Sequence, residues 1–207
     1  MNLKAKKIIK ITAIIIAIPA LVGIITLIVL KSTGMPLQDD YVIDWKDENL
    51  EAAIREETGI YGRDIVYGDV KNLEEVTIEN KEINDISALR NLKNLKYLNL
   101  LYAGISDIST LGRLTNLEYL NLYGNNISDI RPLRNLKNLS ELCLGNNDIL
   151  DIRTLSTLTN LTTLDLNSND IKDITPLSNL TNLTTLDLRR NFVTDYSPVS
   201  HVPDLIH

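Results

Sequence analysis

The sequence predicts an α/β solenoid with a parallel sheet, preceded by a small helical cap and by one transmembrane helix. Three observations predict this architecture: an uncharged apolar run near the N-terminus, a short amphipathic segment after it, and a repeating Leu and Ile pattern beyond that. The 207-residue chain then divides into a basic stub, a membrane anchor, a tether, a cap with a partial coil, and the repeats, at 1–10, 11–30, 31–40, 41–75 and 76–207.

Charge is segregated along the chain. Residues 1–31 carry five lysines and no acid, which gives +5, whereas the remainder carries −11. An acidic body without a Lys/Arg patch argues against nucleic acid as a partner, because phosphate neutralisation dominates such binding. One Cys and two His argue against a disulfide framework and against the usual zinc spacings. We expect no metal and no cofactor.

Residues 11–30 contain no charged side chain, and as a helix these 20 residues reach about 30 Å, enough to cross a bilayer. A cleaved secretory signal is the alternative, but its apolar region normally spans only about 7–15 residues and ends in small residues. Four lysines precede the run and one follows it. Because basic flanks stay cytoplasmic, we expect a single-pass anchor with the N-terminus inside and the repeats outside, joined by the tether 31–40.

The repeat has a period of 22 residues, and its six blocks begin at Val76, Leu98, Leu120, Leu142, Leu164 and Leu186. Apolar residues recur at block positions 1, 3, 8, 11, 14, 17 and 20. Alternation at positions 1 to 3 predicts a short strand, and the spacing of three from position 11 predicts a tight helical return. One block cannot offset its own ordering entropy by burial, so neighbouring blocks must stack.

Two polar columns accompany the apolar ones. Asn at position 6 falls where the strand turns, and we expect its amide to bond unpaired backbone groups, at Asn125, Asn147, Asn169 and Asn191. Asp occupies position 10 of every block, at Asp85, Asp107, Asp129, Asp151, Asp173 and Asp195. An Asp just before a helical turn can accept hydrogen bonds from its first N–H groups. A calcium ladder is the alternative, but the multiple-ligand clustering of a calcium loop is missing.

The pattern LxxLxLxxNxIxDIxxLxxLxNL resembles the leucine-rich repeats of internalins, which are surface proteins of Gram-positive bacteria, and of a phosphatase-regulating protein of eukaryotes. The resemblance covers about 42–207 and implies a horseshoe whose concave parallel sheet binds proteins. Internalin-like domains open with a helical cap, here DWKDENLEAAIREETGI. We expect Asp47 to be the N-cap of this helix and Gly59 to end it, with an inward apolar stripe of Leu50, Ala53 and Ile54. A sorting motif and an immunoglobulin-like module are missing, so no invasion role is expected.

Side chains at block positions 22, 2 and 4 alternate with buried leucines and should point away from the sheet. Tyrosines gather there in adjacent blocks, and strands about 4.8 Å apart would let Tyr97 and Tyr119 touch. Exposed aromatics favour partner binding, although cross-strand pairs that only stabilise the sheet are the alternative. Acids further along favour a basic partner segment. The predicted partner-binding residues are Tyr97, Asn99, Leu101, Tyr102, Tyr119, Asn121, Tyr123, Glu141, Asp165, Asp187 and Arg189.

The function expected from these features is a non-enzymatic surface protein of the bacterial cytoplasmic membrane that holds a protein ligand on its repeats. A phosphate loop, an activated nucleophile and a metal-ligand cluster are not apparent, and we predict no catalytic residue. Cell-wall carbohydrate recognition, with tyrosines stacking on sugar rings, and a regulatory or scaffold role in a membrane complex are the alternatives. Cys143 is expected to be an inert thiol, because nearby carboxylates raise thiol pKa values.

The last block departs from the consensus at several positions, including Phe192, Tyr196 and Val199. These departures indicate a degenerate terminal coil, which would leave part of the apolar edge of the stack exposed to solvent. We therefore predict weak self-association through this coil.

Overall fold

The computed structural model describes residues 39–207, so the predicted membrane span 11–30 and most of the tether lie outside the described residues. Within 39–207, no helix is both long enough and apolar enough to cross a membrane. The first described residue already contacts the cap. The main-chain oxygen of Asp39 accepts the N–H of Gly68 at 2.7 Å, and its carboxylate pairs with Lys71 at 2.5 Å.

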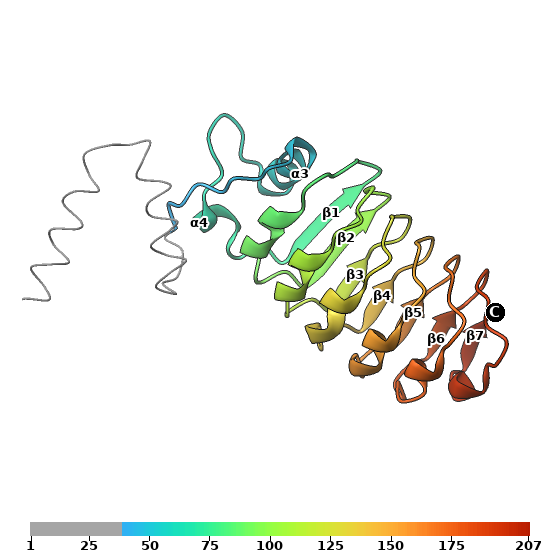
Figure 1. Ribbon diagram of the computed structural model, residues 1–207. Helices are drawn as coiled ribbons and strands as arrows, with labels where there is room; N and C mark the ends of the chain where they lie inside the picture. The colour runs from blue at the N-terminus through green and yellow to red at the C-terminus, as the bar shows by residue number, and fades with distance from the viewer. Residues whose placement is uncertain (1–38) are drawn as a thin grey trace, which may run out of the picture.

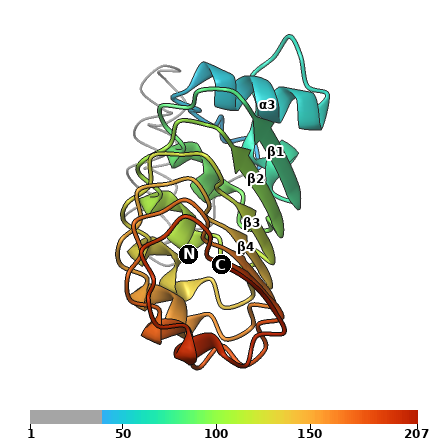
Figure 2. The same ribbon diagram turned by 90° about the vertical axis from the view of Figure 1, so that its right-hand side faces the viewer.

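Seven parallel strands form one sheet and follow one another in chain order (Figure 1). The strands are β1 Glu75–Glu79, β2 Tyr97–Leu101, β3 Tyr119–Asn121, β4 Glu141–Cys143, β5 Thr163–Asp165, β6 Thr185–Asp187 and β7 Asp204–Ile206. A 3₁₀ helix follows each of the first six, namely η1 Ser87–Asn91, η2 Ser109–Arg113, η3 Arg131–Asn135, η4 Arg153–Thr157, η5 Thr175–Leu177 and η6 Ser197–Val199. Strands line one side of the stack and 3₁₀ helices another (Figure 2). The predicted solenoid is confirmed.

One continuous apolar core runs through the coils and into the cap. The predicted apolar positions fill it: in the fifth block, each of the seven side chains is at most 2% exposed, namely Leu164, Leu166, Ile171, Ile174, Leu177, Leu180 and Leu183. Strand pairing places the first residues of successive blocks side by side, from Val76 beside Leu98 to Leu164 beside Leu186. Stacking therefore supplies the burial that a single coil lacks.

The cap helix α3 spans Glu48–Thr58, as predicted. It begins after Asp47, whose Oδ1 accepts the N–H of Leu50 at 2.9 Å, and it ends at Gly59, which adopts the left-handed conformation with φ 68°. The predicted inward stripe is buried. A second short helix, α4 Tyr67–Val70, completes the cap. The other carboxylate oxygen of Asp47 accepts the N–H of Asn84 at 2.8 Å, which ties the cap to the first coil.

The Asn column at position 6 joins each coil to the preceding one. Asn147 donates to the carbonyl groups of Leu144 at 3.0 Å and of Leu122 at 2.9 Å, and its Oδ1 accepts the N–H of Ile127 at 3.0 Å. The predicted role of this column is confirmed. A second column at position 19, which we did not predict, donates to carbonyl groups 23 residues earlier, at Asn94, Asn116, Asn138, Asn160 and Asn182.

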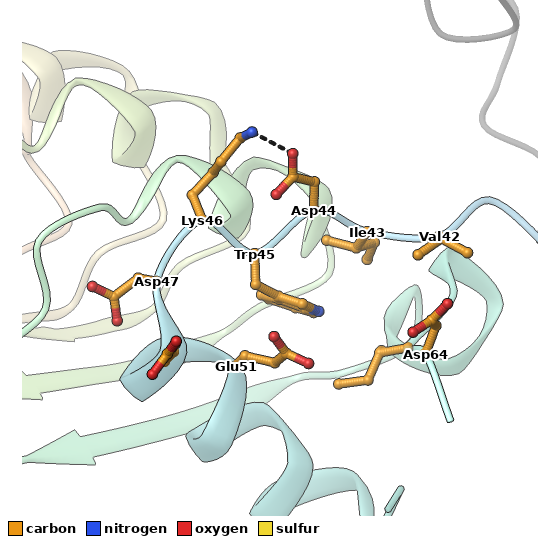
Figure 3. A pocket seen from close by; sticks show the side chains of 10 residues that line it. Val42, Ile43, Asp44, Trp45, Lys46, Asp47, Glu51 and Asp64 are labelled. Atoms are coloured by element: carbon orange, nitrogen blue, oxygen red, sulfur yellow. Dashed lines mark ion pairs between the residues drawn. The ribbon is translucent and has the colours of Figure 1, made fainter. Parts of the chain in front are cut away.

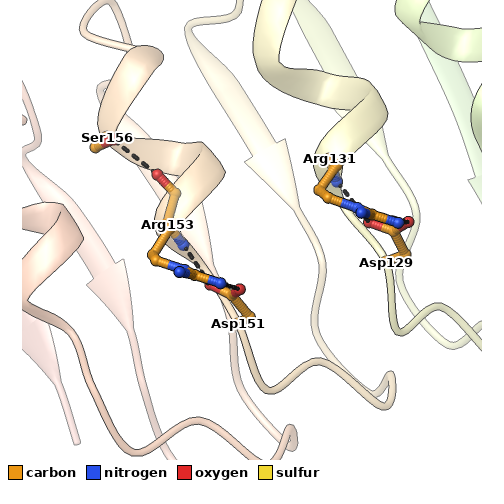
Figure 4. A network of polar contacts seen from close by, with 5 residues as sticks. All are labelled: Asp129, Arg131, Asp151, Arg153 and Ser156. Carbon is orange, nitrogen blue, oxygen red and sulfur yellow. Dashed lines mark hydrogen bonds and ion pairs between the residues drawn. The ribbon is translucent and has the colours of Figure 1, made fainter.

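The Asp column caps the 3₁₀ helices. Each of the six carboxylates accepts the backbone N–H two residues later, at 2.6–3.0 Å. Arg131 and Arg153 also form ion pairs with the carboxylates of Asp129 and Asp151, respectively (Figure 4). Hydrogen bonding to the first turn confirms the capping interpretation. Within the described part of the chain, no group of three or more potential ligands is arranged to hold a metal ion.

The predicted 22-residue register is wrong for the last coil, which is shorter than the others. Leu205 pairs with Leu186, only 19 residues earlier, and so lies at the first strand position of a new coil. The 22-residue period had placed Leu205 at position 20 of the sixth block. Val199 and Val202 remain buried, and the chain then enters β7 directly, without the apolar residue that normally fills position 20. Leu205 is compatible with either core position, so the period alone could not reveal the shortening.

Candidate protein-binding face

Strand pairing brings the predicted surface rows together on one face of the sheet. Tyr97, Tyr119 and Glu141 are neighbours in one row, and Asn99, Asn121, Cys143, Asp165 and Asp187 form the next. The structure thus places all eleven predicted residues on β2–β6 or within two residues after these strands.

Four tyrosines form two aromatic pairs on this face, and we call Tyr97, Tyr102, Tyr119 and Tyr123 the Tyr patch. The rings of Tyr97 and Tyr119 stack with centroids 4.2 Å apart and planes within 6°. Those of Tyr102 and Tyr123 meet edge to face at 5.6 Å. Tyr102 is 46% exposed, and the other three are half-buried. The patch therefore offers ring surface with polar tips to a partner.

Burial raises the pKa of Tyr119 above its usual value, and the neighbouring Cys143 and Tyr97 act in the same direction. Burial likewise raises the pKa of Tyr123, with Tyr102 and Asp165 adding to it. Both side chains are therefore neutral phenols at physiological pH. Each can donate and accept a hydrogen bond with a partner.

Two glycines leave the space that the rings of Tyr102 and Tyr123 occupy, and the sequence analysis did not predict this. A Cβ at Gly124, where φ is 71°, would lie 2.2 Å from the Tyr102 ring. A Cβ at Gly145 would lie 2.7 Å from the Tyr123 ring. The rings therefore lie against bare backbone of the next coil. A glycine one block after a surface tyrosine is the sequence signal that could have revealed this contact.

Four of the predicted contact residues also hold the backbone. Oδ1 of each accepts the N–H two residues later, at 2.9–3.2 Å, in Asn99, Asn121, Asp165 and Asp187. Asn99 is only 5% exposed and Asp187 only 7%. Such bonds are typical of Asn and Asp near turns. These side chains shape the face more than they present groups to a partner.

The predicted acidic stretch is less acidic than its composition indicates. Burial raises the pKa of Asp187, but Arg189 more than offsets this by donating from Nε at 3.0 Å and Nη2 at 2.5 Å, so the pKa lies below its usual value. The Asp187 carboxylate thus stays ionised, and the positive charge of Arg189 compensates it. Burial raises the pKa of Asp165, although bonds from Asn167 oppose the shift. Glu141 remains as an exposed acid, so support for a basic partner segment is reduced.

Cys143 lies between these residues and is half-buried. Burial raises its pKa to about 11, and the carboxylates of Asp165 and Glu141 add to the shift. The sequence anticipated the direction, but the main cause is burial. Beside the Tyr patch, a cavity of about 250 Å³ is lined by Tyr123, Asn167, Arg189 and Arg190; Asn167 and Arg190 were not among the predicted site residues.

Comparison with known proteins supports the assignment of the repeats. Residues 115–158 and 159–201 match the family described as leucine-rich repeats (two copies). An internalin of Listeria monocytogenes strain 4b F2365, InlF, has a crystal structure that matches with a TM-score of 0.63 and 30% identity, over 84% of this chain and 58% of that one. The chain therefore spans little more than half of that InlF chain. No curated protein matches the sequence.

Internalin C2 of the same strain matches with a TM-score of 0.57 and 26% identity, over 79% of this chain and 92% of that one. Repeats of this kind are protein-interaction modules. The chain is an internalin-like leucine-rich repeat protein.

Proposed function

We propose that this chain is a non-enzymatic, single-pass protein of the bacterial cytoplasmic membrane that binds a protein partner through the sheet face of its repeats. The N-terminus would lie inside, residues 11–30 would span the membrane, and the repeats would lie outside. The uncharged run and the lysines before it support this topology. The observation that carries the binding proposal is the Tyr patch, in which two aromatic pairs gather on adjacent coils.

The chemistry of the patch favours a protein partner. Tyrosine offers a large contact area at a low cost in side-chain entropy, and it is enriched among residues that dominate binding energy. The stacked and edge-to-face contacts already hold the rings in place in the free protein. Binding therefore costs little additional side-chain entropy.

Replacing Tyr97, Tyr119 and Tyr123 together with Ser tests the patch. We expect partner capture by chemical crosslinking on intact cells to be lost, whereas the free energy of unfolding falls by only about 1–3 kcal/mol, the sum of a few aromatic contacts. Tyr61→Ser, at a tyrosine 67% exposed in the cap, is the control and should change neither measurement. A large stability loss with capture retained would mean that the tyrosines only stabilise the sheet.

The orientation has its own test. Protease added to intact cells whose wall has been permeabilised should digest the repeats. Repeats that stay protected until the membrane is lysed would contradict the outward topology.

A further inference from the structure

The cap, which lies at the opposite end of the repeats from β7 (Figure 1), holds a cavity of about 270 Å³ (Figure 3). The segment Val42–Glu48 and the first turn of α3 form most of its wall, and Asp64 and Ile65 close the remaining side. No residue of the Tyr patch lines it. Its volume is below the roughly 300–1,000 Å³ typical of pockets for drug-sized ligands, so it suits a single side chain.

Trp45 supplies an unpaired hydrogen-bond donor to this cavity. The side chain is only 3% exposed, and its indole Nε1 has no hydrogen-bond partner among the described residues. Figure 3 shows the nitrogen directed toward the space between Glu51 and Asp64. A buried N–H without an acceptor costs free energy, and such groups in native proteins usually find protein, water or a ligand.

Five carboxylates line the cavity, and three of them already have partners. Asp44 pairs with Lys46, which is the only cation among the lining residues, and Glu51 pairs with Arg55 at 2.6 Å. Asp47 is held by two backbone N–H groups, as described above. The carboxylates of the remaining two, Glu48 and Asp64, form no ion pair or hydrogen bond with another described residue; Arg63 donates only to the main-chain oxygen of Asp64.

We propose that the cap cavity binds a basic residue of a partner peptide. The indole N–H of Trp45 donates to a main-chain carbonyl of that peptide, and the cationic side chain lies toward Asp64, on the side to which the indole nitrogen points (Figure 3). A metal ion alone would satisfy the carboxylates but not the indole donor, and an apolar ligand would satisfy neither. This site is independent of the Tyr patch, so either one can fail without the other.

Trp45 is the only tryptophan in the chain, which makes it a specific reporter. Full-length protein labelled with ¹⁵N at the indole nitrogen gives one indole cross-peak in an NMR spectrum. Titration with Nα-acetyl-lysine N-methylamide should shift this peak saturably. The neutral Nα-acetyl-norleucine N-methylamide should bind at least about fivefold more weakly, the loss expected for a partly exposed ion pair. A peak that lysine does not move, or that both probes move equally, would overturn the proposal.

Variants separate the two halves of the site. Asp64→Asn should weaken lysine binding about fivefold or more, whereas Glu118→Gln, an exposed acid on the repeats, should leave it unchanged. Trp45→Phe keeps the buried ring and removes the donor; a dye-labelled lysine peptide should then bind about fivefold more weakly by fluorescence anisotropy. Unchanged affinity in a folded Trp45→Phe protein would overturn the indole's role. Should that variant not fold, the carboxylate variant decides.

Discussion

Asn147 shows how a single residue holds two coils together. It is 8% exposed, accepts one backbone N–H and donates to three carbonyl groups; the N–H of Ile127 and the carbonyl of Leu122 belong to the preceding coil. The side chain thus replaces a backbone partner that the turn cannot supply. Where Ala103 interrupts the column, the main-chain oxygen of Ala103 itself accepts the N–H of Ile83 at 2.9 Å.

We predict that Asn147→Ala lowers the free energy of unfolding by about 2–4 kcal/mol, because it leaves buried backbone groups unpaired. Urea denaturation measures the change. Asn135→Ala is the control: this Asn is exposed, and its side chain forms no hydrogen bond to any described residue. Its substitution should cost less than about 0.5 kcal/mol. Equal losses in the two variants would refute the bridging role.

Cys143 gives a second prediction for a single residue. With a pKa of about 11, about 0.1% of the thiol is ionised at pH 8, and the thiolate is the reactive species. Alkylation by iodoacetamide in the folded protein should accelerate about tenfold per pH unit between pH 8 and 10. A rate that levels off below pH 9 would show that the thiol is not protected by burial.

Among the elements, the 3₁₀ helices depend on the Asp column. The side chain of Arg153 is the main reason that the pKa of Asp151 falls to about 2, and the backbone N–H of Arg153 acts in the same direction. Because the folded-state pKa lies below the unfolded value, the carboxylate stabilises the fold above about pH 4. This stabilisation is lost as pH falls toward 2.

Asp151→Asn should therefore lower the Tm at pH 7, and the difference from the unmodified protein should vanish as pH approaches 2. Thermal unfolding monitored by circular dichroism at several pH values measures this. Asp148→Asn, in the same block, removes an exposed charge whose side chain bonds no other described residue, and should show no such pH-dependent difference. A difference that persists at pH 2 would show that the charge is not what caps the helix.

At the scale of the whole molecule, the sequence predicted the stack because each apolar column is filled by an apolar residue in every coil. Leu164 meets Leu142 and Leu186 on either side, so one block defines the next. The cap helix was predictable from its end signals at Asp47 and Gly59. The shortened last coil was not, because Leu205 satisfies either of two core positions.

The site was predictable only in part. Strand alternation and register were enough to bring Tyr97 against Tyr119. The orientation of Tyr102 over Gly124 depends on its left-handed backbone, with φ 51°, which no pattern indicated. The burial of Asp187 under Arg189 depends on side-chain packing, so composition overstated the acidity of the face.

Self-association is a further prediction at this scale. Leu205 and Ile206 in the edge strand β7 are half-buried, and Phe192 in the last block is 60% exposed. An apolar strand edge can pair with a second copy. Light scattering should show a molar mass that rises with concentration, and Leu205→Lys should reduce that rise. A strictly monomeric mass at high concentration would contradict the prediction.

The central claim is that the sheet face, at the Tyr patch, contacts a protein partner. Site-specific photocrosslinking on intact cells tests it most directly, with the photoreactive residue at Glu141, beside Tyr119 on the face, or at the exposed Arg134 in η3. We predict protein adducts from position 141 and none from position 134, and loss of the former when Tyr97 and Tyr119 are replaced with Ser. Adducts from position 134 alone, or adducts at 141 that survive these substitutions, would contradict the claim.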